Sequence, residues 1–178
     1  MDKNVERLIQ LLDKDTMDKC QETALWLKRF SKAQNVSEEL LQSASICDIG
    51  KMYISKSILN KEGRLTDSEL EIVKMHPYFG YQICIENGID KRIAEIILFH
   101  HGKNPFHLQA IPAPNREIVA EAKILYTFDV YQALTNEKAY RNALDNEAAV
   151  NILNNEQSRY CCFDDDAINF LKNASNTF

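Results

Sequence analysis

Glycine and proline are scarce in this sequence, which has five glycines and four prolines among 178 residues. So few turn-forming residues argue against a turn-rich β fold and favour helices. Long apolar runs are also absent, and the longest is far too short to cross a bilayer. The first residues are of mixed charge and lack the apolar segment of a signal peptide. From these absences we expect a cytoplasmic protein that makes no membrane contact.

Paired-cysteine motifs are missing as well. The five cysteines are odd in number, and none of their spacings resembles a zinc knuckle or a CxxC redox pair. We expect free thiols, with Cys84 and Cys162 acting as small buried hydrophobic residues. The net charge of −5 argues against a broad surface for nucleic acid or anionic membrane. A phosphorylated small ligand stays compatible with it, because a bound metal and a few local cations can override the overall sign.

What the sequence does contain is a strong helical pattern. Apolar residues make up 45% of the chain and charged residues 26%, as in an ordinary globular protein with a hydrophobic core. No internal repeat, low-complexity stretch or linker is visible, so we expect one domain over residues 1–178. Apolar side chains recur at helical spacing, which predicts an all-α bundle of about seven to eight helices. A long helix is expected over about residues 116–134 and a shorter one over about 146–154.

Local signals place several helix starts. Ser37 and Asp164 each precede an apolar-periodic segment and are predicted to be N-cap residues. Thr66 and Glu69 have the spacing of a capping box. In the helix expected over about residues 18–33, the predicted core residues are Leu25, Trp26 and Phe30.

Asp129 breaks the burial pattern of the long helix. Ile118, Ala122 and Leu125 share one apolar face, and Asp129 falls on the same stripe. A carboxylate there is costly unless it is paired or binds a metal. Two interpretations stay open: a metal ligand, or a residue that caps a neighbouring helix or pairs with a cation.

Three of the four histidines lie where a helix begins or ends. His100 and His101 end a helix with an apolar face, and His76 precedes the helix-breaking Pro77. Asp48 lies in the turn after the third helix. Each could be a capping or turn residue, but together with Asp129 they form a nitrogen and oxygen ligand mixture that suits Fe, Mn, Zn or Ni.

Several motifs carry a resemblance to a known family. Residues 47–83 read CDIGKMYISKSILNKEGRLTDSELEIVKMHPYFGYQI, and Phe99-His100-His101 follows them. Residues 128–144 read FDVYQALTNEKAYRNAL, and Cys162-Phe163-Asp164 lies near the end. These motifs, in this order, resemble the HD-GYP family of the HD-domain metal-dependent phosphohydrolases. The resemblance covers about residues 18–171.

The resemblance implies an all-α fold, a centre of two or three metal ions, and hydrolysis of cyclic di-GMP. Asp48 and Lys51 would then be catalytic, and Lys51 would face the phosphate or the nucleophile. Lys138 and Arg141 would bind substrate phosphates together with Lys51. The implied metal ligands are Asp48, His76, His100, His101 and Asp129.

The sequence also departs from the family pattern. Cys47 stands where the family has the histidine of its HD pair, and the place of an earlier ligand histidine falls near Lys19 or Cys20. The Gly-Tyr-Pro loop after His101 is absent. We therefore predict one divalent transition metal (Fe, Mn, Zn or Ni) on the side of Asp48 and the three histidines, and loss of the second site. Cys47 is either a substitute thiolate ligand or a buried free thiol.

These departures lead to three functional hypotheses. The preferred one is an HD-GYP-like protein with a degraded metal site and weak or no cyclic di-GMP hydrolysis. The first alternative is an active phosphohydrolase that uses one metal on cyclic di-GMP or another phosphorylated nucleotide. The second is a non-catalytic signalling module that binds a nucleotide or a protein partner. Pairing of two copies through the first helix is a further expectation, and nucleic acid is not an expected partner.

Overall fold

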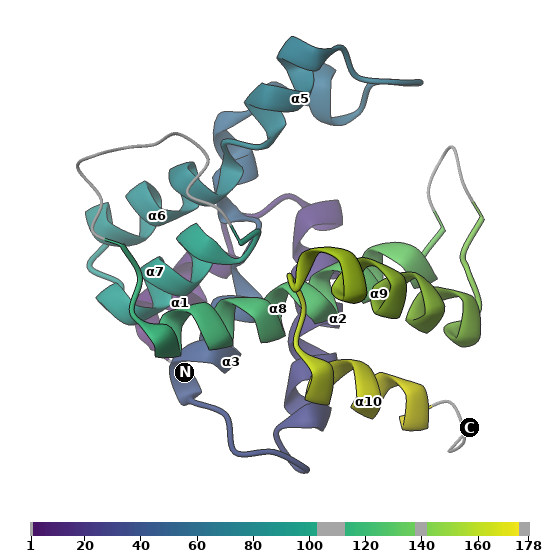
Figure 1. Ribbon diagram of the computed structural model, residues 1–178. Helices are drawn as coiled ribbons and strands as arrows, with labels where there is room; N and C mark the ends of the chain where they lie inside the picture. Colours follow the sequence, from purple (N-terminus) through teal and green to yellow (C-terminus); the bar gives the residue numbers. More distant parts are fainter. Residues whose placement is uncertain (1, 103–112, 138–141, 175–178) are drawn as a thin grey trace.

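The computed structural model describes residues 2–102, 113–137 and 142–174, and these residues form helices and no strand (Figure 1). In chain order the elements are α1 (Lys3–Ile9), α2 (Lys14–Phe30), α3 (Glu38–Ser45), the 3₁₀ helix η1 (Ile49–Tyr53), α4 (Lys56–Leu59), α5 (Asp67–Val73), α6 (His76–Glu86), α7 (Lys91–Phe99), α8 (Arg116–Thr135), α9 (Asn146–Tyr160) and α10 (Asp165–Ala174). The predicted all-α class is confirmed. Short segments such as α4 add helices beyond the seven or eight expected.

The predicted caps form as expected. The Ser37 side chain accepts a hydrogen bond from the backbone N–H of Leu40 at the start of α3. Thr66 and Glu69 form the reciprocal pair of a capping box at the start of α5. Asp164 accepts from the backbone N–H of the third residue of α10 at 2.9 Å. Each cap satisfies a backbone donor that the helix itself leaves unpaired.

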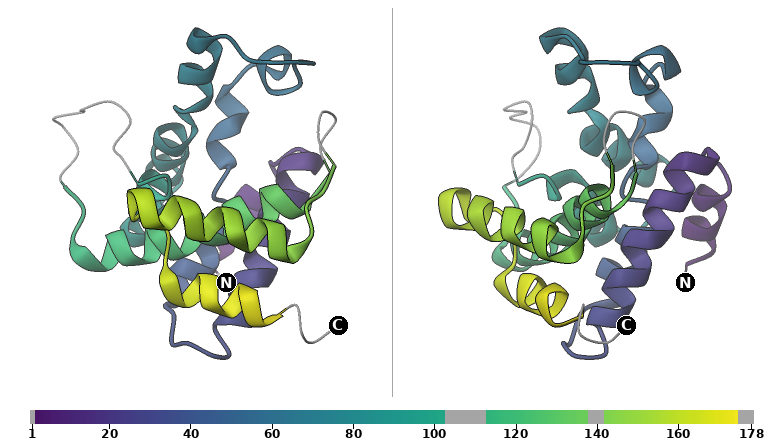
Figure 2. Two further views of the ribbon diagram at one scale, coloured as in Figure 1. Left: turned by 45° about the vertical axis from the view of Figure 1, so that its right-hand side comes forward. Right: turned by 90° about the vertical axis from the view of Figure 1, so that its right-hand side faces the viewer.

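The core forms around α8. This helix packs against α2, α3, α7, α9 and α10, and Figure 2 shows it running through the bundle. Phe30 of α2 and Phe128 of α8 are fully buried, with ring centroids 5.4 Å apart, and Phe170 of α10 lies 5.5 Å from Phe30. The helix that bears Asp129 is therefore fixed from several sides.

A close backbone contact joins η1 to α6. A Cβ atom on Gly50 would lie 1.9 Å from the carbonyl oxygen of His76 and 2.5 Å from the backbone nitrogen of Gly80. Only glycine allows the two segments to approach this closely. The contact sets Asp48, which precedes η1, beside His76, the first residue of α6.

Some details differ from the sequence-based expectations. Leu25 is 50% exposed, so its prediction as a core residue was wrong; the buried face of α2 is instead formed by Cys20, Thr23, Leu27 and Phe30. Helix α9 continues to Tyr160, beyond the expected end near residue 154. Within the ranges described, no helix has both the length and the apolarity needed to cross a membrane.

Candidate metal centre

The structure brings the predicted ligands together from four elements. Asp48 precedes η1, His76 begins α6, His100 and His101 follow α7, and Asp129 lies within α8. The ring centroid of His76 lies 5.3 Å from that of His100 and 5.0 Å from that of His101. Asp48, His76, His100 and Asp129 are buried, whereas His101 is partly exposed.

Backbone carbonyls fix the orientation of two of the imidazoles. His76 Nδ1 lies 2.8 Å from the carbonyl oxygen of Val73, and His100 Nδ1 lies 2.6 Å from that of Ile97. Because a carbonyl oxygen only accepts, each Nδ1 must carry the proton and each Nε2 presents its lone pair. This is the arrangement typical of metal-binding histidines, whose second nitrogen donates to a carbonyl or carboxylate.

The free nitrogen atoms converge. His76 Nε2 lies 3.2 Å from His101 Nε2, and one ring nitrogen from each of the three histidines lies within 4.8 Å of the others. His100 Nε2 is buried and has no hydrogen-bond partner among the described residues. Nitrogen atoms this close can share one transition-metal ion after small side-chain movements. The triad therefore fits an ion by its geometry and by its unsatisfied buried atom.

Burial also keeps the imidazoles neutral. It lowers the pKa of His76 to about 4, although the neighbouring charge of Asp48 opposes the shift. It likewise lowers the pKa of His100 and, together with the other two rings, that of His101. Near neutral pH the three rings are therefore uncharged, which is the form that binds metals.

Asp48 is the most heavily contacted carboxylate of the cluster. Its Oδ2 lies 2.7 Å from Lys19 Nζ and 2.7 Å from Lys51 Nζ, and its Oδ1 lies 3.3 Å from His76 Nε2. Burial acts to raise the pKa of Asp48, but the charges of Lys19 and Lys51 outweigh it and lower the pKa well below the usual range. Asp48 is thus ionised and touches both the lysines and the histidine triad.

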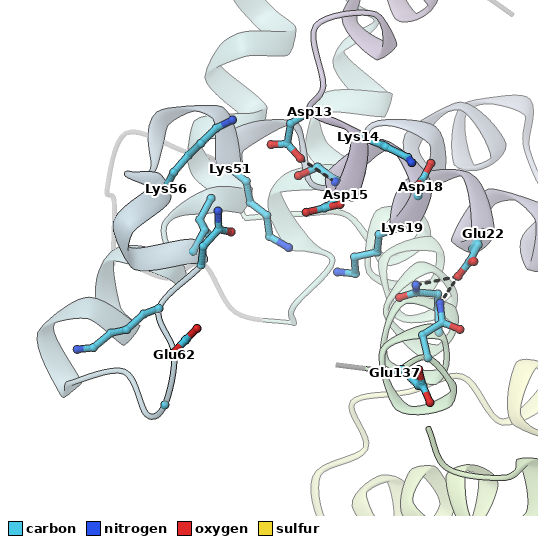
Figure 3. A pocket seen from close by; sticks show the side chains of 17 residues that line it. Asp13, Lys14, Asp15, Asp18, Lys19, Glu22, Lys51, Lys56, Glu62 and Glu137 are labelled. Carbon is cyan, nitrogen blue, oxygen red and sulfur yellow. Dashed lines mark hydrogen bonds between the residues drawn. The ribbon is translucent and has the colours of Figure 1, made fainter. Parts of the chain in front are cut away.

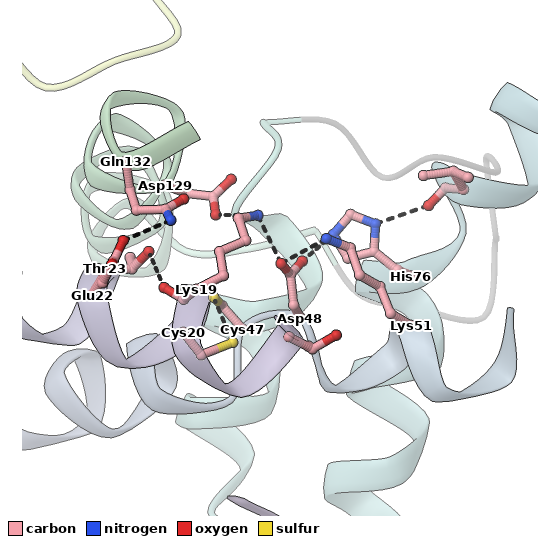
Figure 4. A network of polar contacts seen from close by, with 12 residues as sticks. Lys19, Cys20, Glu22, Thr23, Cys47, Asp48, Lys51, His76, Asp129 and Gln132 are labelled. Atoms are coloured by element: carbon pink, nitrogen blue, oxygen red, sulfur yellow. Dashed lines mark hydrogen bonds and ion pairs between the residues drawn. The ribbon is translucent and has the colours of Figure 1, made fainter. Parts of the chain in front are cut away.

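Lys19 reaches a second carboxylate. Its Nζ lies 2.8 Å from Asp129 Oδ1, so the ammonium sits between Asp129 and Asp48 (Figure 4). The side chain is only 16% exposed. Burial acts to lower the pKa of Lys19, but the two carboxylates raise it well above the usual value.

A polar pocket of about 880 Å³ opens beside the cluster (Figure 3). Lys19 and Lys51 extend into it from opposite walls. Lys56 lies on the same side as Lys51, and Lys61 also lines the pocket. The α2 wall bears the acidic side chains Asp13, Asp15, Asp18 and Glu22.

A second pocket of about 410 Å³ also borders the cluster. Its lining includes His100, His101, Lys123 and Tyr126. The ring of Tyr126 meets that of His101 edge to face, with centroids 4.9 Å apart. His100 and His101 therefore line this smaller pocket, and Lys19 and Lys51 line the larger one.

Comparison with known proteins identifies the scaffold. The sequence pattern of the HD domain family matches residues 3–165. The chain belongs to the HD domain family.

Relatives of this HD domain include bacterial phosphodiesterases. A cyclic di-GMP phosphodiesterase of Vibrio cholerae is 35% identical over 130 residues, which cover 65% of this chain and 25% of that protein. A 3'3'-cGAMP-specific phosphodiesterase 3 of the same species is 30% identical over 137 residues, or 77% of this chain and 29% of that protein. The cyclic di-GMP phosphodiesterase response regulator RpfG of Xanthomonas campestris is 28% identical over 152 residues, which cover 77% of this chain and 40% of that protein. The HD domain thus spans between a quarter and two fifths of these relatives.

Cys47 lies in this HD domain as a buried thiol beside a second thiol. Its Sγ is 3.7 Å from Cys20 Sγ, and both residues are fully buried. The hydrogen bond with Cys20 and burial raise the pKa of Cys47 well above its usual value. A zinc ligand must be a thiolate, so the neutral Cys47 favours the predicted alternative of a free buried thiol.

Two predicted phosphate-binding residues, Lys138 and Arg141, lie outside the described residues, as does the segment 103–112 where the family has its Gly-Tyr-Pro loop. Lys51 lines the larger pocket, and its role toward a phosphate or a nucleophile stays a prediction. Lys19 is the site residue that the sequence reasoning missed. It lies four residues before the buried Thr23 and eight before the buried Leu27, so the stripe argument that singled out Asp129 applies to it as well.

The lowered histidine pKa values predict acid sensitivity of the metal-free HD domain. Between pH 6.5 and about 4, unfolded His76 binds a proton that folded His76 excludes, so the free energy of unfolding falls as the pH falls. The loss from His76 alone is about 3 kcal/mol. Denaturant unfolding in the presence of a chelator, at a series of pH values, measures it. The His76→Asn variant should show a shallower decline, and a flat wild-type profile would contradict the burial of the imidazoles.

Proposed function

We propose that this HD domain binds one divalent transition-metal ion on His76, His100 and His101, beside Asp48, and binds a cyclic dinucleotide in the larger pocket that Lys19 and Lys51 line. We further propose that it hydrolyses cyclic di-GMP weakly or not at all. The observation that carries the proposal is the convergence of three imidazole nitrogens, two of them oriented by backbone carbonyls. The names of the relatives supply the substrate class, because they act on cyclic di-GMP or 3'3'-cGAMP.

The residues of this chain have distinct roles in the proposal. When bound, a transition-metal ion would supply Lewis-acid chemistry toward a phosphate ester. Lys51 uses one ammonium proton on Asp48 and is 21% exposed at the pocket, so its other protons are free to bind a phosphate oxygen. Asp48 orients Lys51 and lies against His76. His100 is fully buried, so its metal-binding atom Nε2 is shielded from solvent.

Two features support weak turnover. Asp48 Oδ2 is already bound by two ammonium groups, which leaves only Oδ1, 3.3 Å from His76 Nε2, to contact an ion or act as a base. The acidic α2 wall repels a dianionic ligand from one side of the pocket. Loss of part of the electrostatic stabilisation in such a site typically lowers rates by several powers of ten.

Metal analysis of His100→Ala tests the proposal. Wild-type protein incubated with Mn²⁺ or Zn²⁺ and then desalted is expected to retain about one ion per chain, and His100→Ala less than about a tenth of that, because one buried ligand is lost. Inductively coupled plasma mass spectrometry measures the ratio. His107→Ala serves as a control, since it removes the one histidine outside the predicted set. A wild-type protein without bound ion, while folded, would contradict the proposal.

Substrate is tested with the same preparations. A titration with cyclic di-GMP and 3'3'-cGAMP should give binding to the metal-loaded protein, while chromatography of the products shows little or no linear dinucleotide. Rapid, Mn²⁺-dependent turnover would instead support the alternative of an active one-metal phosphohydrolase. No binding of either nucleotide would favour another phosphorylated ligand or a protein-binding role. Pairing of two copies through α1 stays a prediction that sedimentation measures.

A further inference from the structure

Two buried carboxylates from different elements converge on one ammonium group. Asp48 precedes η1 and Asp129 lies within α8, and their oxygens lie 2.7 and 2.8 Å from Lys19 Nζ. The exposed fraction of the side chain is 1% for Asp48 and 6% for Asp129. Charges this deeply buried are stable only when an opposite charge lies against them. A cation is therefore a structural requirement of this pair.

We propose that the Lys19 ammonium is the resident cation of the Asp48 and Asp129 pair, takes the place of a second metal ion, and limits the domain to one metal. This inference rests on the proposed function in one respect, the binding of a first ion at the histidine triad. Divalent metals and ammonium groups compete for the same carboxylate oxygens. Because Lys19 is covalently part of α2, its ammonium competes for these oxygens at a high effective concentration.

The surrounding structure fixes Lys19 in this place. Its backbone carbonyl accepts a hydrogen bond from the Thr23 hydroxyl at 3.1 Å within α2. One turn further along, Glu22 of α2 accepts a hydrogen bond from the Gln132 side chain of α8 at 2.9 Å (Figure 4). Glu22 follows Lys19 by three residues, as Gln132 follows Asp129. This hydrogen bond between α2 and α8 thus lies beside the ion pair and helps to hold Lys19 close to Asp129.

Lys51 does not have the same role. It contacts Asp48 but has no ion pair with Asp129 among the contacts of the described residues, and it lies on the pocket side. The two lysines and two carboxylates sum to zero charge. Removing Lys19 leaves one excess negative charge and an emptied volume between two buried oxygens. Removing Lys51 leaves the same excess charge but keeps the ammonium between the carboxylates.

This difference makes Lys19→Ala and Lys51→Ala a matched pair. After incubation with Mn²⁺ or Zn²⁺ and desalting, Lys19→Ala is expected to retain about two ions per chain, and wild type and Lys51→Ala about one. Mn²⁺ should also raise the melting temperature of Lys19→Ala more than that of wild type, because it restores a missing charge. Lys19→Ala combined with Asp129→Ala should return to about one ion.

The outcomes separate this inference from the proposed function. One ion in both wild type and Lys19→Ala would overturn the inference and keep the proposed function. Two ions in wild type would overturn the inference and the limit of one ion in the proposed function, while keeping metal binding at the histidine triad. No ion in wild type but one in Lys19→Ala would overturn the proposed function and support the inference. Lys19→Gln, which keeps a polar side chain, is tested in parallel. If Lys19→Ala and Lys19→Gln are both isolated unfolded, the inference expects Mn²⁺ to refold them. Failure to refold would count against the inference.

Discussion

Replacing Gly50 with alanine is expected to destabilise this HD domain by at least about 3 kcal/mol, which corresponds to a fall of about 6–12 °C in melting temperature. The added Cβ would lie 1.9 Å from the His76 carbonyl oxygen and 2.5 Å from the Gly80 nitrogen. Both are backbone atoms, so no side-chain rotation can relieve the overlap, and η1 must move away from α6. Differential scanning calorimetry measures the effect.

The same displacement should separate Asp48 from His76. Gly50→Ala is therefore expected to lower metal retention as well as stability, even though Gly50 has no side chain to bind a metal. Gly63→Ala is the matched control, because Gly63 has a φ of +98° and no atom within 4 Å of its added Cβ. It should lose only the smaller cost of a positive φ, about 1–2 kcal/mol. Equal melting temperatures for the two variants would mean that η1 is not tightly packed on α6.

The helix starts could be predicted from the sequence because short-range interactions determine them. Ser37, Thr66, Glu69 and Asp164 cap helices through bonds that span three residues, so the chain itself contains all the information. Asp129 was found because a charge on an apolar stripe is visible over about three helical turns. The end of α9 was missed because its last turns are polar, and residues 155–160 give no apolar period to extend the helix.

The site itself depended on contacts that span long stretches of sequence. Lys19 and Asp48 are 29 residues apart, and Glu22 and Gln132 are 110 apart. The resemblance to a known family predicted that Asp48, the three histidines and Asp129 would gather, and the structure places these five close together, while Lys138 and Arg141 lie outside the described residues. It could not predict that a lysine would lie between the two carboxylates, because a lysine in a helix is usually solvated. That assignment required the positions of α2 and α8.

Asp48→Asn is the substitution expected to damage both the ion network and the metal site. It leaves Lys51 without a partner carboxylate and leaves Lys19 with Asp129 alone. Breaking a buried ion pair by removing one partner typically costs about 3–5 kcal/mol, which is about 6–20 °C in melting temperature here. Thermal unfolding and metal analysis of the same sample measure the two effects.

The order of effects among carboxylate variants tests the network itself. Asp48 contacts two lysines and a histidine, whereas the ion pair of Asp129 is with Lys19, so Asp48→Asn should destabilise more than Asp129→Asn. Glu71 pairs with Lys74 on the surface, and Glu71→Gln should cost less than about 1 kcal/mol. If Asp48→Asn were as mild as Glu71→Gln, the lysines would be solvated rather than paired. Lys19 would then not be held between the two carboxylates, and a second metal ion could bind there in the wild-type protein.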